Sequence, residues 1–182
     1  MQPIRILTEG LAKLAHQQRY LFTPSDLRGL LRQLSSVSFK TLLSRAVKEG
    51  YLERVCRGLY LYPPANPKDG LLLFHAAARL RADEFNYLSL ETVLSDAGAI
   101  SQVPINWISL MSSGRSNIIN CGHWGSIEFV HTSRKAEELQ DQLIYDSRCG
   151  LWRATVPLAL RDMRATRRSL DLVDRSVIDE FI

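Results

Sequence analysis

The segment from Ser36 to Tyr62 changes its hydrophobic period abruptly, and this change limits the folds open to the chain. Its first half carries apolar residues at helical spacing, at Phe39, Leu42, Leu43, Ala46 and Val47. That spacing predicts a helix with one buried face, and Gly50 predicts its end. The next residues, Tyr51–Val55 and Leu59–Tyr62, are typical of two strands joined by a turn at Cys56–Gly58. The segment therefore predicts a helix followed directly by a hairpin.

Two further helices are predicted before this segment. The range Ile4–Gln17 is amphipathic, and Thr23, Pro24 and Asp26 together are typical of a helix start. The second helix then has one apolar stripe, formed by Leu27, Leu30, Leu31 and Leu34. A turn at Ser35–Ser38 follows, in which Ser36 or Ser38 is expected to cap the third helix. Two helices joined by a short turn and followed by a hairpin predict a winged helix-turn-helix domain.

The outer face of the third predicted helix is polar and basic, and the same end of the chain carries most of the positive charge. Residues 1–62 hold ten Lys and Arg and four Asp and Glu, a formal charge of +6, whereas the remaining 120 residues hold thirteen and fifteen, or −2. A basic first third indicates a domain that binds duplex DNA. The expected DNA contacts are Ser38, Lys40, Thr41, Ser44, Arg45 and Lys48 in the helix and Arg54 and Arg57 in the hairpin. The alternative is a solvated basic face, with Arg57 an incidental exposed charge.

The rest of the chain predicts a second domain of mixed α+β type. Three prolines in the range 63–67 favour a boundary, so we expect domains at 1–62 and 71–182 with a linker at 63–70. The expected helices are Leu71–Arg81, Leu88–Ala97, Ala136–Leu143, Pro157–Arg168 and Leu170–Ile182. The expected strands are Trp107–Met111, Asn117–Asn120, Ser126–Val130 and Trp152–Val156.

A second basic group is predicted on one side of the helix Pro157–Arg168. Its members are Arg161, Arg164, Arg167 and Arg168. This group is interpreted first as a solvated face, with a second DNA-facing surface or a site for an acidic partner as the alternatives.

The sequence offers little support for catalysis, a metal or a cofactor. The chain has neither the glycines and lysine of a phosphate-binding loop nor a Gly-x-Ser-x-Gly turn. Glu128 is not followed by the lysine that a nuclease motif needs. The candidate metal ligands Cys121, His123, His131 and Cys149 match no zinc spacing. We therefore expect no enzyme, no metal and no cofactor.

The cysteine content and the hydropathy of the chain favour a cytoplasmic location. Three widely spaced cysteines form no disulfide framework and suit a reducing compartment. The chain begins without a run of signal-peptide length, and its densest apolar run, Leu71–Ala78, is too short to cross a bilayer. We expect no membrane partner.

Several segments resemble the AbiEi-type antitoxins of type IV toxin–antitoxin systems. The resemblance is strongest over Leu43–Tyr60, Tyr87–Gly98 and Gly125–Thr132, and it continues into Val156–Met163. In the last segment Leu158 and Ala159 stand where Glu-Arg is usual in the family. Many relatives continue beyond the point that corresponds to Ile182.

The resemblance implies a function for each predicted domain. The first would repress the protein's own operon by binding inverted repeats in the promoter, and the second would oppose a toxin of the nucleotidyltransferase class, with or without a stable complex. The leading hypothesis is therefore a DNA-binding autorepressor with antitoxin activity. The alternatives are a winged-helix module that binds proteins instead of DNA and, with less support from the residues, an enzyme acting on nucleic acid.

Overall fold

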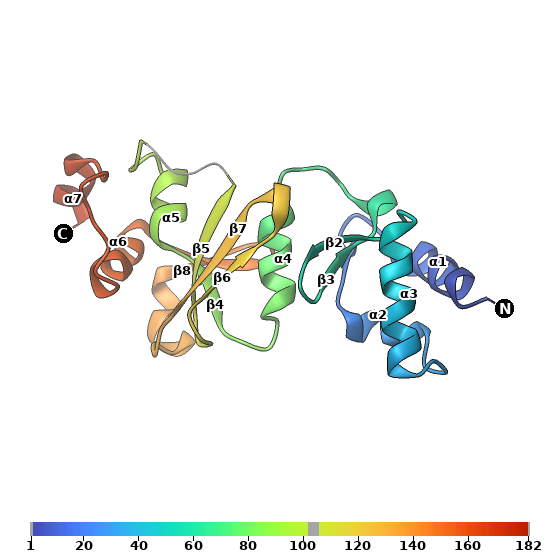
Figure 1. The fold of residues 1–182 in the computed structure, drawn as a ribbon. Helices are drawn as coiled ribbons and strands as arrows, with labels where there is room; N and C mark the ends of the chain where they lie inside the picture. The colour runs from blue at the N-terminus through green and yellow to red at the C-terminus, as the bar shows by residue number, and fades with distance from the viewer. Residues whose placement is uncertain (1, 102–105, 182) are drawn as a thin grey trace. The chain divides into compact units, whose positions relative to one another are not determined.

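The computed structural model describes residues 2–101 and 106–181. Contacts within the chain divide it into two compact units, Met1–Gly70 and Leu71–Ile182. Each unit combines helices with a β-sheet, so the predicted α+β class is confirmed (Figure 1). The helices of the described residues are all too short or too polar to cross a bilayer.

The first unit contains three helices and a small antiparallel sheet. The helices are α1 (Pro3–Leu14), α2 (Pro24–Leu30) and α3 (Ser36–Lys48). The strands are β1 (Leu21–Phe22), β2 (Glu53–Cys56) and β3 (Leu59–Leu61), in the spatial order β1-β3-β2. A 3₁₀ turn, η1 (Pro63–Ala65), follows β3. Three helices with a hairpin beside the last one form the predicted winged helix-turn-helix. The two-residue β1 is too short to give a periodic signal and was missed from the sequence.

The start of α2 is as predicted, but its end is not. Thr23 and Asp26 form a capping box, in which the Asp26 N–H donates to Thr23 Oγ1 and the Thr23 N–H donates to Asp26 Oδ2. The helix ends at Leu30, four residues before the predicted stripe ends at Leu34. The reason lies in the turn, where the Arg28 guanidinium donates to the Leu34 carbonyl at 2.6 Å and holds the chain in a non-helical path.

Both ends of α3 are closed by local hydrogen bonds. The N-cap is Ser35, not Ser36 or Ser38, because the Ser35 hydroxyl accepts from the Ser38 N–H at 3.1 Å. At the other end, Gly50 has φ +80° and donates to the Val47 carbonyl, and the next N–H, of Tyr51, donates to the Ala46 carbonyl. This Schellman pair requires a left-handed residue at position 50. Gly50 therefore ends α3 as predicted and turns the chain into the hairpin.

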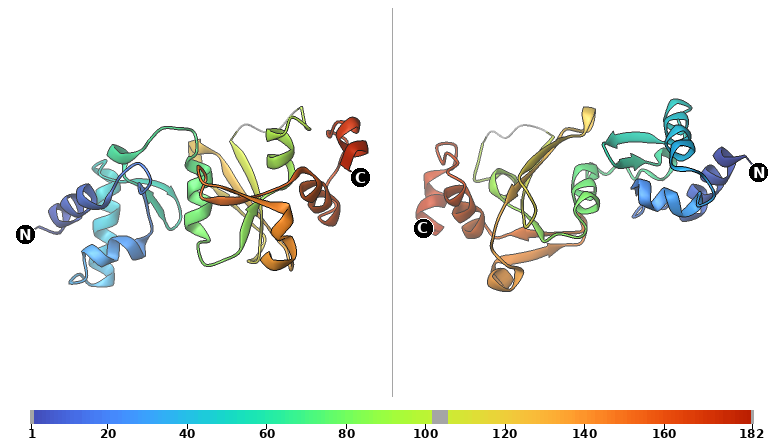
Figure 2. Two further views of the ribbon diagram at one scale, coloured as in Figure 1. Left: turned by 180° about the vertical axis from the view of Figure 1, so that it is seen from behind. Right: turned by 60° about the horizontal axis from the view of Figure 1, so that its bottom comes forward.

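The second unit is built on a six-stranded mixed sheet with the order β6-β7-β5-β4-β9-β8. The strands are β4 (Asn86–Leu88), β5 (Trp107–Ser112), β6 (Asn117–Asn120), β7 (Ser126–His131), β8 (Leu143–Asp146) and β9 (Leu151–Ala154). The helix α4 (Leu72–Leu80) covers one face, and α5 (Leu90–Asp96) and α6 (Val156–Ala165) cover the other (Figures 1 and 2). Two 3₁₀ segments, η2 (Gly122–Trp124) and η3 (Ala136–Gln142), and a last helix, α7 (Arg175–Phe181), complete it.

Four helix predictions in the second unit are wrong in part, and one of them, Pro157–Arg168, ends already at Ala165. The start of the predicted helix Leu88–Ala97 is instead the end of β4, because Tyr87 and Leu88 are fully buried between β5 and β9. A short buried apolar run has the same pattern in a strand and in a helix. The predicted helix Ala136–Leu143 is the 3₁₀ segment η3 followed by the first residue of β8, a strand that was missed. The last helix begins at Arg175 instead of Leu170, and Ile182 lies outside the described residues.

One glycine is required where the parallel pair β5–β7 begins. Gly125 has φ +119°, and a Cβ at this position would lie 1.9 Å from the backbone oxygen of Asn106. The backbone cannot yield as a flexible side chain would, since the Ser126 N–H donates to the same oxygen at 2.9 Å. Gly125 therefore permits the close approach of two backbone segments.

We predict that Gly125→Ala lowers the free energy of unfolding by at least about 2 kcal/mol, through a backbone clash added to an unfavourable φ. Urea denaturation followed by circular dichroism measures the loss. Gly122→Ala is the matched control, because Gly122 also has a positive φ, +61°, but a Cβ there would meet no atom within 4 Å. Equal losses in the two variants would contradict the close-approach argument.

Candidate nucleic-acid interface

The outward face of α3 lies opposite the residues that pack into the core of the first unit. Phe39, Leu42, Leu43 and Ala46 are buried together with side chains of α1 and α2. The helical period places Val37, Thr41, Ser44 and Lys48 on the opposite side, and all four are exposed. Packing of the apolar face thus fixes the rotation of α3 and directs this row to solvent.

All the side chains that the sequence predicts as DNA contacts are exposed. On α3 these are Ser38, Lys40, Thr41, Ser44, Arg45 and Lys48; Arg54 lies in β2 and Arg57 in the turn after it. None is sealed inside the first unit. The sequence analysis did not include Val37 in this face of the helix. Its spacing of four residues from Thr41 was the signal that places both on the same side.

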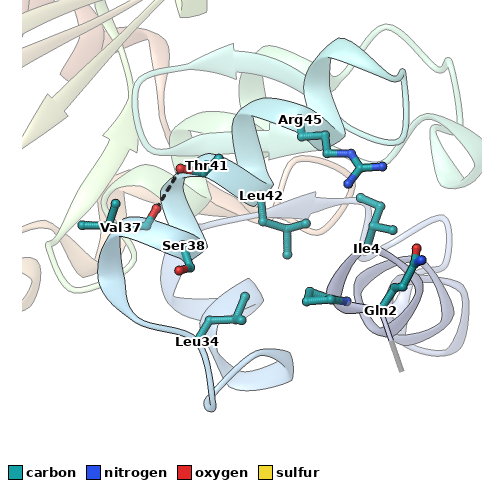
Figure 3. Close-up of a pocket in the computed structure, with 9 residues that line it drawn as sticks. Gln2, Ile4, Leu34, Val37, Ser38, Thr41, Leu42 and Arg45 are labelled. Atoms are coloured by element: carbon teal, nitrogen blue, oxygen red, sulfur yellow. Dashed lines mark hydrogen bonds between the residues drawn. The ribbon is translucent and has the colours of Figure 1, made fainter.

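Local hydrogen bonds on α3 determine which groups Thr41 and Arg45 can offer to a binding partner. The Thr41 hydroxyl donates to the Val37 carbonyl at 3.0 Å, which commits its proton to the helix backbone (Figure 3). Arg45 Nε donates to Glu49 Oε1 at 2.7 Å, and this hydrogen bond and the charge of Glu49 raise the pKa of Arg45. Arg45 therefore carries its charge in an exposed i,i+4 pair, whose strength is a few tenths of a kcal/mol.

A hollow of about 460 Å³ separates the start of α1 from the first turns of α3. It is lined by Gln2, Pro3 and Ile4 from the start of α1 and by Leu34, Val37, Ser38, Thr41, Leu42 and Arg45. Figure 3 shows the Arg45 side chain extending toward Gln2 and Ile4. Arg45 thus lies at the flank of α3 that faces α1, and Thr41, in the outward row, also lines this hollow.

The hairpin beside α3 has the form of a wing with two exposed cations. Cys56 pairs with Leu59 across the two-residue turn Arg57–Gly58. The register shifts between Arg54 and Cys56, so that Val55 and Cys56 are both buried. Such an irregularity bends and twists the strand. Arg54 and Arg57 are left exposed on either side of the buried pair.

Not every cation of the first unit belongs to the surface formed by the outward face of α3 and the wing. Arg28 is half-buried, donates to the Leu34 carbonyl, and places its guanidinium 5.0 Å from the centre of the Phe39 ring. These contacts tie the α2–α3 turn to α3. Arg28 therefore has a structural role and is not part of the proposed DNA-binding surface.

The second basic group is not arranged as predicted. Because α6 ends at Ala165 and Arg167 has φ +56°, Arg167 and Arg168 lie beyond the helix that was expected to align them with Arg161 and Arg164. Arg168 turns toward two carboxylates, with Nη1 2.9 Å from Glu91 and Nη2 in contact with Glu128. Arg161 donates to the Gln142 side chain at 2.7 Å. The prediction of one basic helix side is therefore wrong, and its use as a second DNA surface stays untested.

The cysteines and histidines weighed as metal ligands are not gathered into one site. Within 2–101 and 106–181, no three His, Cys, Asp or Glu side chains are grouped so that they could hold a metal. Cys121 and Cys149 are buried, and burial raises the pKa of the Cys149 thiol to about 11. His131 contacts the Gly114 carbonyl through Nδ1 at 2.9 Å.

The second unit instead contains a buried carboxylate held by hydrogen bonds. Asp162 of α6 is fully buried, accepts from the Ser89 hydroxyl at 2.7 Å and pairs with Arg134 at 2.6 Å. Burial raises the pKa of Asp162, and the donors Ser89 and Arg134 partly offset that rise. The cluster joins the end of β4 to α6 and to the segment after β7. The role of this cluster is therefore structural.

The fold and the exposed basic face define the first unit as a winged helix-turn-helix domain. Residues 10–63 match a family model described as transcriptional regulator, AbiEi antitoxin. This match lies within the amino-terminal unit, and over these residues it confirms the resemblance inferred from the sequence. The family is described by a regulatory role rather than by a catalytic one. No curated protein and no solved structure matches the chain.

We predict that Ser89→Ala lowers the free energy of unfolding by about 1–3 kcal/mol, because a buried carboxylate loses one of its donors. In the variant, the pKa of Asp162 in the folded protein is higher still, so this carboxyl is protonated first as the pH falls. The difference in the free energy of unfolding between the parent and the variant should therefore become smaller at low pH. Chemical denaturation between pH 4 and pH 8 measures both effects. Ser95→Ala, a half-buried serine of α5, is the control, and an equal loss in both variants would contradict the prediction.

Proposed function

We propose that this protein is a transcriptional autorepressor that binds duplex DNA through α3 and the wing, and that it is also an antitoxin. The observation that carries the DNA-binding half is the outward face of α3. Its hydroxyl and basic side chains are exposed because the opposite side is buried, and the wing adds Arg54 and Arg57. In helix-turn-helix proteins the corresponding helix lies in the major groove.

The proposed contacts divide into those that position the domain and those that recognise bases. Lys40, Lys48, Arg54 and Arg57 are suited to phosphates, because lysine and arginine release counterions from the DNA backbone when they bind. Arg45, beside the hollow, is suited either to a phosphate or to guanine, and Thr41 to a thymine methyl group. The proposed operator is an inverted repeat in the protein's own promoter. Two half-sites about 34 Å apart would each take one amino-terminal unit.

We predict that Lys48→Ala and Arg57→Ala each weaken binding to the upstream promoter fragment several-fold. Each should also reduce the slope of log K against log[salt] by about 0.9, since one phosphate contact is lost. Fluorescence anisotropy of the labelled fragment across a salt series gives both quantities. Lys135→Ala, an exposed cation of the second unit, is the matched control.

The same titration separates the repressor from the winged-helix module that binds proteins. A module of that second kind would show no affinity for the fragment at low salt, or equal affinity in the parent and in both variants. Either result would remove the autorepressor proposal.

The antitoxin half is proposed for residues 71–182, with 63–70 as a linker and the cytoplasm as the location. Its support is the family match of the first unit together with the resemblance over Tyr87–Gly98, Gly125–Thr132 and Val156–Met163. A toxin of the nucleotidyltransferase class encoded by the adjacent reading frame is the proposed counterpart, opposed with or without a stable complex.

We predict that the protein restores growth when it is co-expressed with that toxin from unrelated promoters, and that the Arg45→Ala/Lys48→Ala variant restores growth equally well. The variant lacks two proposed DNA contacts but retains the second unit unchanged. Colony counts with and without toxin induction measure the effect. Failure of the parent would contradict the antitoxin proposal, and failure of the variant alone would show that neutralisation depends on the DNA-binding face.

A further inference from the structure

An apolar pair stands in the middle of the polar face of α3. Val37 is the second residue of the helix, and its 76% exposure is the highest among the large hydrophobic side chains in the described part of the chain. Thr41 follows one turn later and is also exposed. Residues four apart lie on the same side of a helix, and Figure 3 shows the two side chains on successive turns.

The hydrogen bond within this pair uses the one donor of the Thr41 side chain, so its oxygen can only accept. Its hydroxyl proton is already donated to the Val37 carbonyl, so the methyl group is the part of the side chain that has no hydrogen bond to satisfy. The Val37 and Thr41 side chains together offer three methyl groups at one place. Ser38 and Ser44 beside the pair are uncharged, whereas Lys40 follows Val37 by three residues and Arg45 follows Thr41 by four.

The position of the pair on the helix identifies the kind of contact. The amino-terminal residues of a helix in the major groove approach the base edges, whereas phosphates are bound by cations and by polar donors. A valine cannot donate to a phosphate or to a base. The one apolar group that a base pair presents in the major groove is the 5-methyl group of thymine.

We infer that Val37 and the methyl group of Thr41 form a contact that recognises the 5-methyl group of one thymine in each half-site. The inference rests on the proposed DNA binding and specifies the base that this part of α3 selects. It makes Val37 a specificity residue, while Lys40, Lys48 and the wing arginines supply affinity that is independent of sequence. Ser38 and Ser44 border the contact, and Lys40 and Arg45 lie one turn from Val37 and Thr41.

The test uses the full-length protein and a library of random 40-base-pair duplexes. Duplexes enriched at low salt are resynthesised with each thymine replaced in turn by deoxyuridine, which removes the methyl group and keeps the base pair. One thymine per half-site should then bind about fourfold more weakly as uracil, the ratio that corresponds to burying one methyl group. Replacement of the other thymines should change the affinity little.

Four variants assign that effect to the pair. Val37→Ala and Thr41→Ser should bind the thymine duplex about fourfold more weakly and lose most of the difference between thymine and uracil at the sensitive position. Thr41→Val keeps a methyl group without the hydroxyl and should retain the difference. Ile144→Ala removes a similarly exposed side chain of β8, at 62%, and should behave as the parent. Circular dichroism checks that each variant is folded.

Every other result would contradict the inference, and each such result has a different meaning. Enriched duplexes without a methyl-sensitive thymine, or a sensitivity that persists in Val37→Ala and Thr41→Ser, would show that the pair does not contact the base. Weaker self-association of Val37→Ala in sedimentation, with no methyl effect, would assign the pair to an interface between copies. If no duplex is enriched at all, the proposed DNA binding itself fails, and the inference falls with it.

Discussion

The burial of one side of α3 is the constraint on which the functional face depends. Phe39, Leu42, Leu43 and Ala46 enter the same core as Leu7 and Leu11 of α1 and Leu27 of α2. Each fully buried side chain of this kind contributes about 1.5–3 kcal/mol, so rotation of α3 by even one residue would be costly. The exposed row is therefore held in place by the packing of the opposite side of the helix. A polar face needs this support, because its own side chains contribute little to stability when they are solvated.

The sequence predicted those parts of the first unit that are governed by local rules. The helix start at Thr23 and the glycine end of α3 at Gly50 depend on residues within a few positions, and both are confirmed. The end of α2 and the strand β1 depend on distant contacts. Arg28 reaches the Leu34 carbonyl across the turn, and Leu21 pairs with Leu61 forty residues later. Neither contact leaves a periodic pattern.

The sequence predicted the charged residues of the candidate site but missed its apolar residue. Lysine and arginine on the outer face of a helix are conspicuous, and Lys40, Arg45 and Lys48 are exposed as expected. Val37 was overlooked because the sequence analysis placed it in the turn Ser35–Ser38, whereas α3 already begins at Ser36 and so carries Val37 on the same side as Thr41. In the second unit, Arg168 shows the converse. Arg168 stands in a basic run of the sequence, yet it pairs with Glu91 of α5 and Glu128 of β7. The sequence alone could not place these two carboxylates beside it.

The two units use charge in opposite ways. In the second unit, arginine side chains are bound by carboxylates of other elements, as in the pairs Arg134–Asp162 and Arg153–Asp96, and these pairs join helices and loops to the sheet. In the first unit, the one ion pair on α3 is the exposed Arg45–Glu49 pair within a single helix. Breaking an exposed pair costs little, whereas breaking a buried one leaves an uncompensated charge. A phosphate can therefore compete for the cations of α3 more easily than for Arg134 and Arg168, whose guanidinium groups are partly buried against carboxylates.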